Sequence, residues 1–179
     1  MLGSWDVNVT VGSMPEKVAT ACAKLDELKG AQYAPIAYLG SQVVNGTNYA
    51  VLMEQTIITG KDTKNIVVVT FNEKPGDIDL TLVSIEKVLE GGAEYGGFQI
   101  DVQTDEFPKA AQLAFDKAIE DFVGSKIEPF AYLGSQVVNG EIFAFAAVET
   151  SFYKNDIQKS VVLVSVYNVD ETLEIADIL

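Results

Sequence analysis

The side chains that usually perform catalysis are scarce in this 179-residue chain. It contains no histidine, and because all 12 of its basic residues are lysines it contains no arginine either. Ser-His and Cys-His nucleophile pairs, the usual general base at neutral pH and the commonest zinc ligand are therefore missing. Paired carboxylates remain a chemical option, but no pair stands out by its spacing. The composition argues against an enzyme, and we expect no cofactor and no metal site.

The only cysteine, Cys22, falls on the apolar stripe of a predicted helix. A cysteine in such a place is either a small core residue or a reactive thiol, and its position on the stripe favours the core. A single cysteine also excludes a disulfide within the chain and leaves the compartment open.

The net charge of −14 limits the classes of partner. Nucleic-acid binding depends on cations that displace phosphate counterions, so no nucleic-acid partner is expected. Anionic lipid surfaces are disfavoured for the same reason. The sequence has no run of 18 apolar residues and no visible signal peptide, so we expect no membrane partner.

A repeat organises the chain. Residues 37–46 (AYLGSQVVNG) recur letter for letter as residues 131–140, a period of 94 residues. This period fits a small domain and exceeds the unit of a solenoid. The sequence therefore predicts two domains, residues 1–92 and 93–179, joined by the glycine-rich stretch at residues 90–97.

Both halves carry the same pattern of secondary structure. Alternating apolar residues predict a strand, an i, i+3, i+4 stripe predicts a helix, and four further strands follow as a meander. The stripes predict helices that reach Leu28 in the first half and Val123 in the second. The predicted fold class is α+β, with each domain an antiparallel sheet of four or five strands wrapped around one α-helix.

The repeated segment ends in a hairpin signal. Asn-Gly between two apolar runs favours a type I′ turn, because both central residues of that turn have positive φ. This backbone preference explains Asn45 and Gly46 as a dipeptide. It does not explain why Gln42 and Gln136, and the residues that flank them, are identical in the two copies.

The segment Gln42-Val43-Val44-Asn45-Gly46 resembles the Gln-X-Val-X-Gly hairpin motif of the cystatins, the protein inhibitors of papain-like cysteine proteases. The resemblance, strongest to the stefin branch, covers nearly all of residues 1–89 and residues 95–168 more loosely. It implies an inhibitor that fills the protease cleft as a wedge with three elements. The candidate binding residues are Leu2, Gly3, Gln42, Val43, Val44, Asn45, Gly46, Pro75 and Gly76.

The second copy offers a weaker set of candidates. It lacks the Pro-Gly of the second loop, and its leading glycines are tethered to the first domain. In both copies asparagine stands where the familiar inhibitors often carry alanine, which leaves a polar group to be satisfied by the protease. The candidates of the second copy are Gly96, Gly97, Gln136, Val137, Val138, Asn139 and Gly140.

Three other hypotheses remain open at this point. In the first hypothesis the two domains are a non-inhibitory scaffold that binds another protein. In the second, the chain forms a homodimer by domain swapping through its long hairpins. A third hypothesis is a small-molecule pocket between helix and sheet. The large residues Phe115, Ile119 and Phe122 argue that this space is filled.

Overall fold

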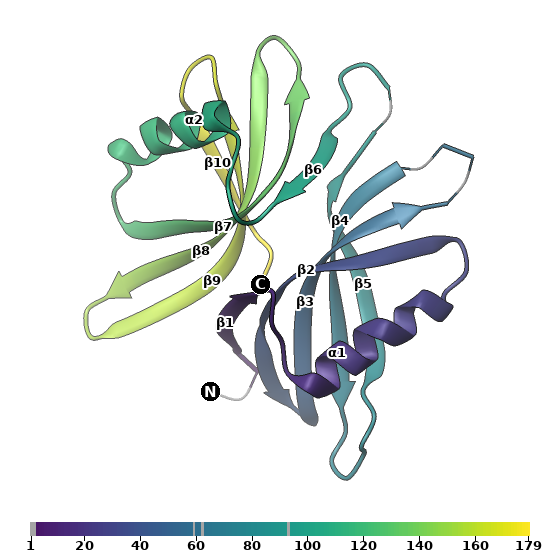
Figure 1. Ribbon diagram of the computed structural model, residues 1–179. Helices are drawn as coiled ribbons and strands as arrows, with labels where there is room; N and C mark the ends of the chain where they lie inside the picture. Colours follow the sequence, from purple (N-terminus) through teal and green to yellow (C-terminus); the bar gives the residue numbers. More distant parts are fainter. Residues whose placement is uncertain (1–2, 59, 62, 93) are drawn as a thin grey trace. The chain divides into compact units, whose positions relative to one another are not determined.

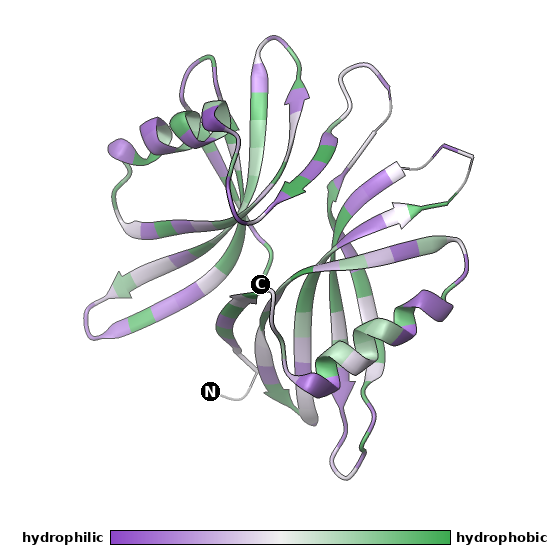
Figure 2. Cartoon of the chain, in the orientation of Figure 1, coloured by the Kyte–Doolittle hydropathy of each residue, from purple (hydrophilic) through white to green (hydrophobic). Residues whose placement is uncertain are grey.

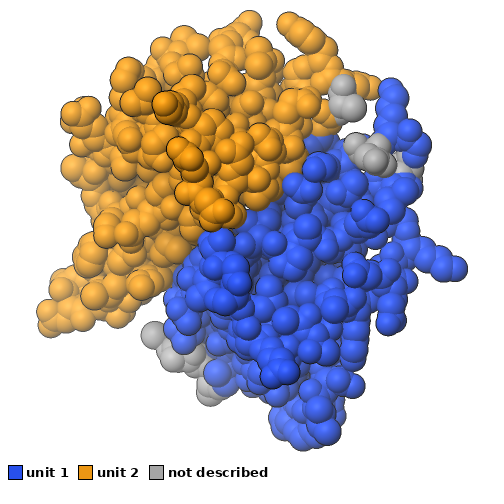
Figure 3. All heavy atoms as spheres, in the orientation of Figure 1, with its two compact units in different colours: residues 1–91 blue, residues 92–179 orange. Residues whose placement is uncertain are grey.

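The computed structural model describes residues 3–58, 60–61, 63–92 and 94–179. The chain divides into two compact units, Met1–Gly91 and Gly92–Leu179 (Figure 3). We refer to them as unit 1 and unit 2. No helix in the described part of the chain is long and apolar enough to cross a membrane.

Unit 1 consists, over its described residues, of a strand, a short helix and four strands (Figure 1). Their bounds are β1 Trp5–Val11, α1 Glu16–Ala23 with a 3₁₀ turn Lys24–Glu27, β2 Ala31–Val44, β3 Gly46–Ile57, β4 Thr63–Glu73 and β5 Thr81–Glu90. The strands form an antiparallel sheet in the order β1-β2-β3-β4-β5. Because neighbouring strands alternate in direction, the start of β1, the β2–β3 turn and the β4–β5 loop lie at one end of this sheet. We call this the hairpin end of unit 1.

Unit 2 has the same order of elements over its described residues. They are β6 Gln99–Gln103, α2 Lys109–Glu120, β7 Ser125–Val137, β8 Glu141–Tyr153, β9 Asp156–Tyr167 and β10 Leu173–Asp177. The antiparallel sheet has the order β10-β9-β8-β7-β6. The residues that precede β6, the β7–β8 turn and the β9–β10 loop form the hairpin end of unit 2.

The core of each unit lies between its helix and one face of its sheet. In unit 1 the apolar side of α1 packs on a row of strand residues that includes Tyr49, Val51, Met53 and Val69. In unit 2 the ring of Phe145 makes edge-to-face contacts with Phe107, Phe115 and Tyr132 at centroid separations of 5.1 to 5.7 Å. Phe115, Ile119 and Phe122 thus take part in a filled core, as their size predicted.

The strands are apolar on both faces. Between the core residues of unit 1, the alternate positions Ala50, Leu52, Ile66 and Val68 are also buried. Hydrophobic residues therefore recur without a strict period of two along the central strands (Figure 2). Most of the buried hydrophobic residues in the described part of the chain belong to strands.

The predicted fold class is wrong. Strands hold 59% of the chain and helical residues 14%, so the protein is mostly β, with two five-stranded antiparallel sheets and two short helices in its described part. The predicted cystatin-type α+β fold, with a sheet wrapped around one long helix in each domain, needs helices that the chain does not form. The first α-helix spans only eight residues and the second twelve.

Both helices end before the predicted limits of Leu28 and Val123. Pro15 and Pro108 occupy the N-cap positions, with extended ψ and no side-chain hydrogen bond that caps the helix. At the other end of the first helix a 3₁₀ turn replaces the last α-helical turn, and Leu28 is extended and 40% exposed. The apolar stripe thus ends at Leu25, which is buried.

Candidate binding site

Gly40 and Gly134 of the repeated segment are required by the architecture. The pairing register of β2 with β3 shifts between Tyr38 and Gly40, and that of β7 with β8 shifts between Tyr132 and Gly134. A Cβ on Gly40 would overlap the carbonyl oxygen of Asp6 in β1, and one on Gly134 would overlap that of Gln99 in β6. Close approach of two backbones explains glycine at both positions.

The tyrosine and serine of the repeat also have structural roles. Tyr38 and Tyr132 are buried beneath the helices. Burial raises the pKa of both phenols, and side-chain hydrogen bonds with Ser41 and Ser135 lower it in part. The same pair therefore recurs because each copy buries a hydroxyl that needs a partner.

The glutamine of the motif binds the residues that lead into each sheet. Gln42 Nε2 donates to the carbonyl oxygen of Gly3 at 2.8 Å, and the Gly3 amide donates to the Val43 carbonyl at 3.1 Å. In unit 2, Gln136 Nε2 donates to the carbonyl oxygen of Gly96 at 2.6 Å. In both copies a leading glycine is therefore held against the hairpin. Leu2 lies outside the described residues.

The last part of the repeat is exposed. Val43 and Val44 are 54% and 37% exposed, Val137 and Val138 are 61% and 50% exposed, and the asparagines that follow them are exposed. None of these four valines belongs to the buried core of its unit, although β-branched residues suit the strand ends on which Val43, Val44 and Val137 lie. The fold explains Gly40, Ser41 and Gln42, whereas the identity of the Val-Val pairs points to a role at the surface.

The two hairpin turns differ although their sequences are identical. In unit 1, β2 ends at Val44, β3 begins at Gly46, and Asn45 keeps a negative φ. In unit 2 three residues separate the strands, and both Asn139 (φ 48°) and Gly140 (φ 128°) have positive φ. The predicted type I′ turn, which needs two positive φ angles, is therefore wrong for the first copy.

Contacts with the neighbouring loop account for this difference. A Cβ on Gly46 would overlap the carbonyl oxygen of Glu73 and would lie 3.2 Å from the Lys74 Cα, so the tip of the first hairpin is pressed against the end of β4. A Cβ on Gly140 would meet only the side chain of Val169. The tip glycine of the first turn thus rests against backbone and that of the second against a side chain, and the backbone contact of the second hairpin begins one residue later, where the Asn168 amide donates to the Glu141 carbonyl at 2.9 Å.

Pro75 and Gly76 form a β-turn directly beside the first hairpin. The Asp77 amide donates to the Lys74 carbonyl at 3.1 Å, and Gly76 has φ 88°, as the third position of a type II turn requires. Ile78, two residues beyond the glycine, is 92% exposed. The structure thus brings the Pro-Gly turn to the same end of the sheet as the Gly3–Val43 contact.

A row of amides stiffens the hairpin end of unit 1. Asn48 Nδ2 donates to Gln42 Oε1 at 2.9 Å, and Asn72 Nδ2 donates to Asn48 Oδ1 at 2.8 Å. Together with the Gln42–Gly3 bond, this row connects the residues that precede β1 with β2, β3 and β4. At the matching places unit 2 has Ile142 and Tyr167, which are paired across β8 and β9.

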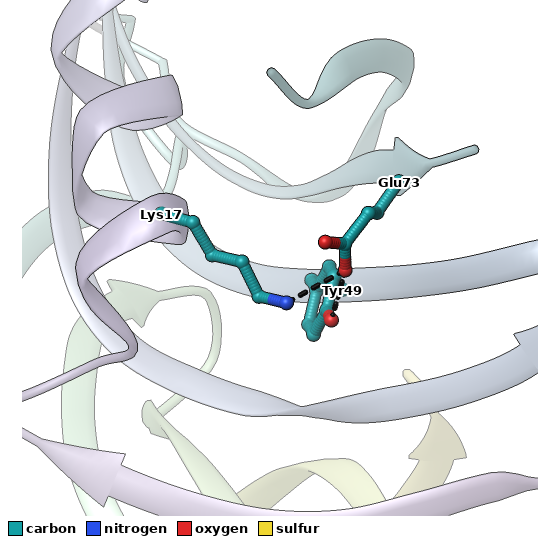
Figure 4. Close-up of polar contacts among 3 residues, drawn as sticks. All are labelled: Lys17, Tyr49 and Glu73. Atoms are coloured by element: carbon teal, nitrogen blue, oxygen red, sulfur yellow. Dashed lines mark hydrogen bonds and ion pairs between the residues drawn. The ribbon is translucent and has the colours of Figure 1, made fainter. Parts of the chain in front are cut away.

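A three-residue cluster joins the end of β4 to helix α1 (Figure 4). Glu73 Oε2 accepts from Lys17 Nζ at 2.6 Å and from the Tyr49 hydroxyl at 2.7 Å, and the ammonium lies 4.9 Å from the Tyr49 ring centroid. The bond from Lys17, followed by that from Tyr49, holds the pKa of Glu73 below its ordinary value. The interaction of Lys17 with Glu73, followed by that with Tyr49, raises the pKa of Lys17. The cluster fixes the strand end against which Gly46 rests.

Glu73→Gln should make the stability of unit 1 less dependent on pH. A carboxylate with a depressed pKa stabilises the native state above its unfolded pKa, and this contribution is lost as the pH falls through the folded value. The wild type should therefore have the higher urea midpoint at neutral pH, and the difference should disappear in acid. The measurement is urea unfolding followed by the fluorescence of Trp5, the only tryptophan.

Glu90→Gln is the control for this experiment, because Glu90 pairs with Lys87 at 3.1 Å but is 72% exposed. This variant should behave as the wild type at every pH. A midpoint difference for Glu73→Gln that persists unchanged into acid would show that the charge of Glu73 contributes nothing.

The leading segment of unit 2 forms a turn of its own. The Gly97 amide donates to the Glu94 carbonyl at 2.9 Å, Gly96 has φ 82°, and Tyr95 is fully exposed. Gly96 lies near the side chain of Val138, whereas Gly97 packs against the backbone of Gly92. Gly96 therefore joins the hairpin end of unit 2, and Gly97 has a structural role.

The remaining chemistry of the described residues is sparse. Burial raises the pKa of the Cys22 thiol to about 11, and Cys22 belongs to the core of unit 1, which confirms the core interpretation. Among the described residues no three His, Cys, Asp or Glu side chains come together as metal ligands.

Sequence reasoning missed several residues of the hairpin end. Ile78 and Val169 stand in loops without a motif, and the amides of Asn48 and Asn72 become partners only once the strand register is known. Glu73 gives no signal either, because its partner Lys17 is 56 residues away.

No protein-family model matches the chain, and no curated protein is significantly similar to it.

Proposed function

We propose that this protein is an inhibitor of papain-like cysteine proteases and that unit 1 enters the active-site cleft with its hairpin end. Gly3, the Val43-Val44 tip and the Pro75-Gly76 turn would form the contact surface, together with Ile78. The observation that carries the proposal is the exposed Val-Val pair, repeated exactly in two hairpins and lying outside both buried cores. The likeness of residues 42–46 to the cystatin motif supplies the class of partner.

The hairpin end is suited to binding without catalysis. Its amide row and the contact of Gly46 with Glu73 hold the tip in one conformation, which lowers the entropic cost of docking. Val43, Val44 and Ile78 supply apolar area that is already exposed in the free protein. An interface of roughly 1,600 Å² is enough for a stable complex of this kind.

Asn45 limits the affinity for a protease that the hairpin end of unit 1 can reach. Its side chain stands exposed at the tip, and a cleft that gave it no partner would reduce binding by about 1 to 3 kcal/mol. We therefore expect the protein to prefer proteases with a polar group at the base of the cleft.

Titration of papain with the full chain tests this proposal. Cleavage of a small fluorogenic peptide should fall with added protein, and the protein itself should stay uncut. The control variant is Val11→Asp, which is matched to a substitution at the hairpin tip. Val11 is 40% exposed, similar to Val44, but it lies at the end of β1 that is far from the hairpin end. This control should inhibit as the wild type does. Failure to inhibit papain and cathepsin-type proteases at micromolar concentration would contradict the proposal.

Binding without inhibition is the outcome that would favour the scaffold hypothesis. The domain-swapped homodimer stays a prediction as well, and size-exclusion chromatography of the full chain would test it.

A further inference from the structure

Both hairpin tips carry a sequence with chemistry of its own. In an Asn-Gly pair the glycine amide nitrogen can attack the asparagine side-chain carbonyl carbon, Cγ. A new N–Cγ bond forms, the Cγ–Nδ2 bond breaks, and ammonia leaves with the proton of the attacking amide. Water then opens the five-membered succinimide ring to give either aspartate or isoaspartate. No reactant other than water is needed, and glycine favours the attack because it has no side chain to hinder it.

Attack requires the asparagine side chain and the following amide to move toward each other. Asn45 and Asn139 are both exposed, so solvent reaches each of them. What differs is the freedom of the glycine. Gly46 is the first residue of β3, is paired with Val44, and is pressed against the backbone of Glu73.

Gly140 has more freedom than Gly46. It belongs to a three-residue loop between β7 and β8, closed by a hydrogen bond of 3.0 Å from the Val138 amide to the Gly140 carbonyl. The atoms nearest to where its Cβ would lie belong to the side chain of Val169, which is 73% exposed and can rotate away. Backbone pairing with the next loop begins only at Glu141, whose carbonyl accepts from the Asn168 amide at 2.9 Å. The backbone of residues 138–140 can therefore reach the geometry of attack at a lower cost.

We propose that Asn139-Gly140 is a site of spontaneous deamidation in the folded protein, and that the identical Asn45-Gly46 is protected by the end of β4. The product places a carboxylate beside Val137 and Val138, and isoaspartate also adds one carbon to the main chain of the turn. The hairpin end of unit 2 thus changes with time, whereas that of unit 1 keeps its structure. This inference does not depend on protease inhibition.

The experiment compares the two sites within one molecule. The full chain is incubated at mildly alkaline pH, folded in buffer or unfolded in urea, and peptides that contain residues 45 and 139 are followed by mass spectrometry. In buffer, Asn139 should be converted about tenfold faster than Asn45, a difference of about 1.4 kcal/mol in activation free energy. In urea the two rates should converge, because the residues before and within both pairs are the same. Asn139→Gln should abolish the signal of the second peptide in buffer.

Three results would overturn the inference. Equal rates in buffer would mean that the end of β4 gives no protection, and a faster reaction at Asn45 would reverse the assignment. No conversion at either site in buffer, while both react in urea, would show that the unit 2 turn is as constrained as that of unit 1.

Discussion

Replacing Val43 and Val44 together with aspartate should weaken binding to papain by about 100-fold, or roughly 2.7 kcal/mol. The two side chains are the exposed apolar part of the first hairpin tip, and a cleft that excludes water would have to bury two charges in their place. Residues at the centre of an interface often contribute 2 kcal/mol or more. The inhibition constant for a peptide substrate measures the effect.

The second copy provides the matched control. Val137→Asp with Val138→Asp makes the same change in an identical sequence that is at least as exposed. If unit 1 is the inhibitory unit, this variant should keep nearly full potency. Equal loss in both double variants would mean that the two hairpins act alike, and loss only in the second would place the function in unit 2.

Gly40→Val should lower the free energy of unfolding of unit 1 by about 3 kcal/mol or more, an amount reached only by severe structural conflicts. The new Cβ would overlap the carbonyl oxygen of Asp6, so β1 would have to move away from β2. This movement would also displace Gly3 from Gln42, because both contacts depend on the same strand pair. Urea unfolding followed by Trp5 fluorescence reports on this unit, since Trp5 begins β1.

Gly12→Ala is the control that separates the effect of steric overlap on stability from the effect of a positive φ. Gly12 has φ 78°, but no atom lies within 4 Å of where its Cβ would stand. Alanine there should cost only about 1 kcal/mol, the penalty of a left-handed conformation. A similar loss for both variants would show that the close approach of β1 and β2 contributes little.

Local sequence signals predicted the order of helices and strands better than the length of the helices and the share of the chain that forms strands. Alternation and turn residues correctly indicated the order of strands and helices in each unit. The apolar stripe through Leu28 predicted a longer helix than forms, because helix length depends on the contacts that the last turn finds. The sheets, apolar on both faces, then account for most of the structure.

The candidate site shows the same limit. The motif residues were visible in the sequence, and hydrogen bonds of the structure join Gly3 to Gln42 and Gly96 to Gln136. The turn conformation was not predictable, because ten identical residues adopt two geometries. What decides between them is a contact with Glu73 or with Val169, each 27 to 29 residues further along the chain. Such contacts are set by strand register, which local patterns do not encode.

The most direct test of the wedge is to compare binding to two forms of papain. One form is free, and the other carries a peptide-like inhibitor covalently attached to its active-site cysteine, so that its cleft is filled. If the hairpin end of unit 1 occupies the cleft, the protein should bind free papain tightly and filled papain at least about 100-fold more weakly. Equal affinity for both forms, measured by isothermal titration calorimetry, would contradict the account, because the contact surface would then lie outside the cleft.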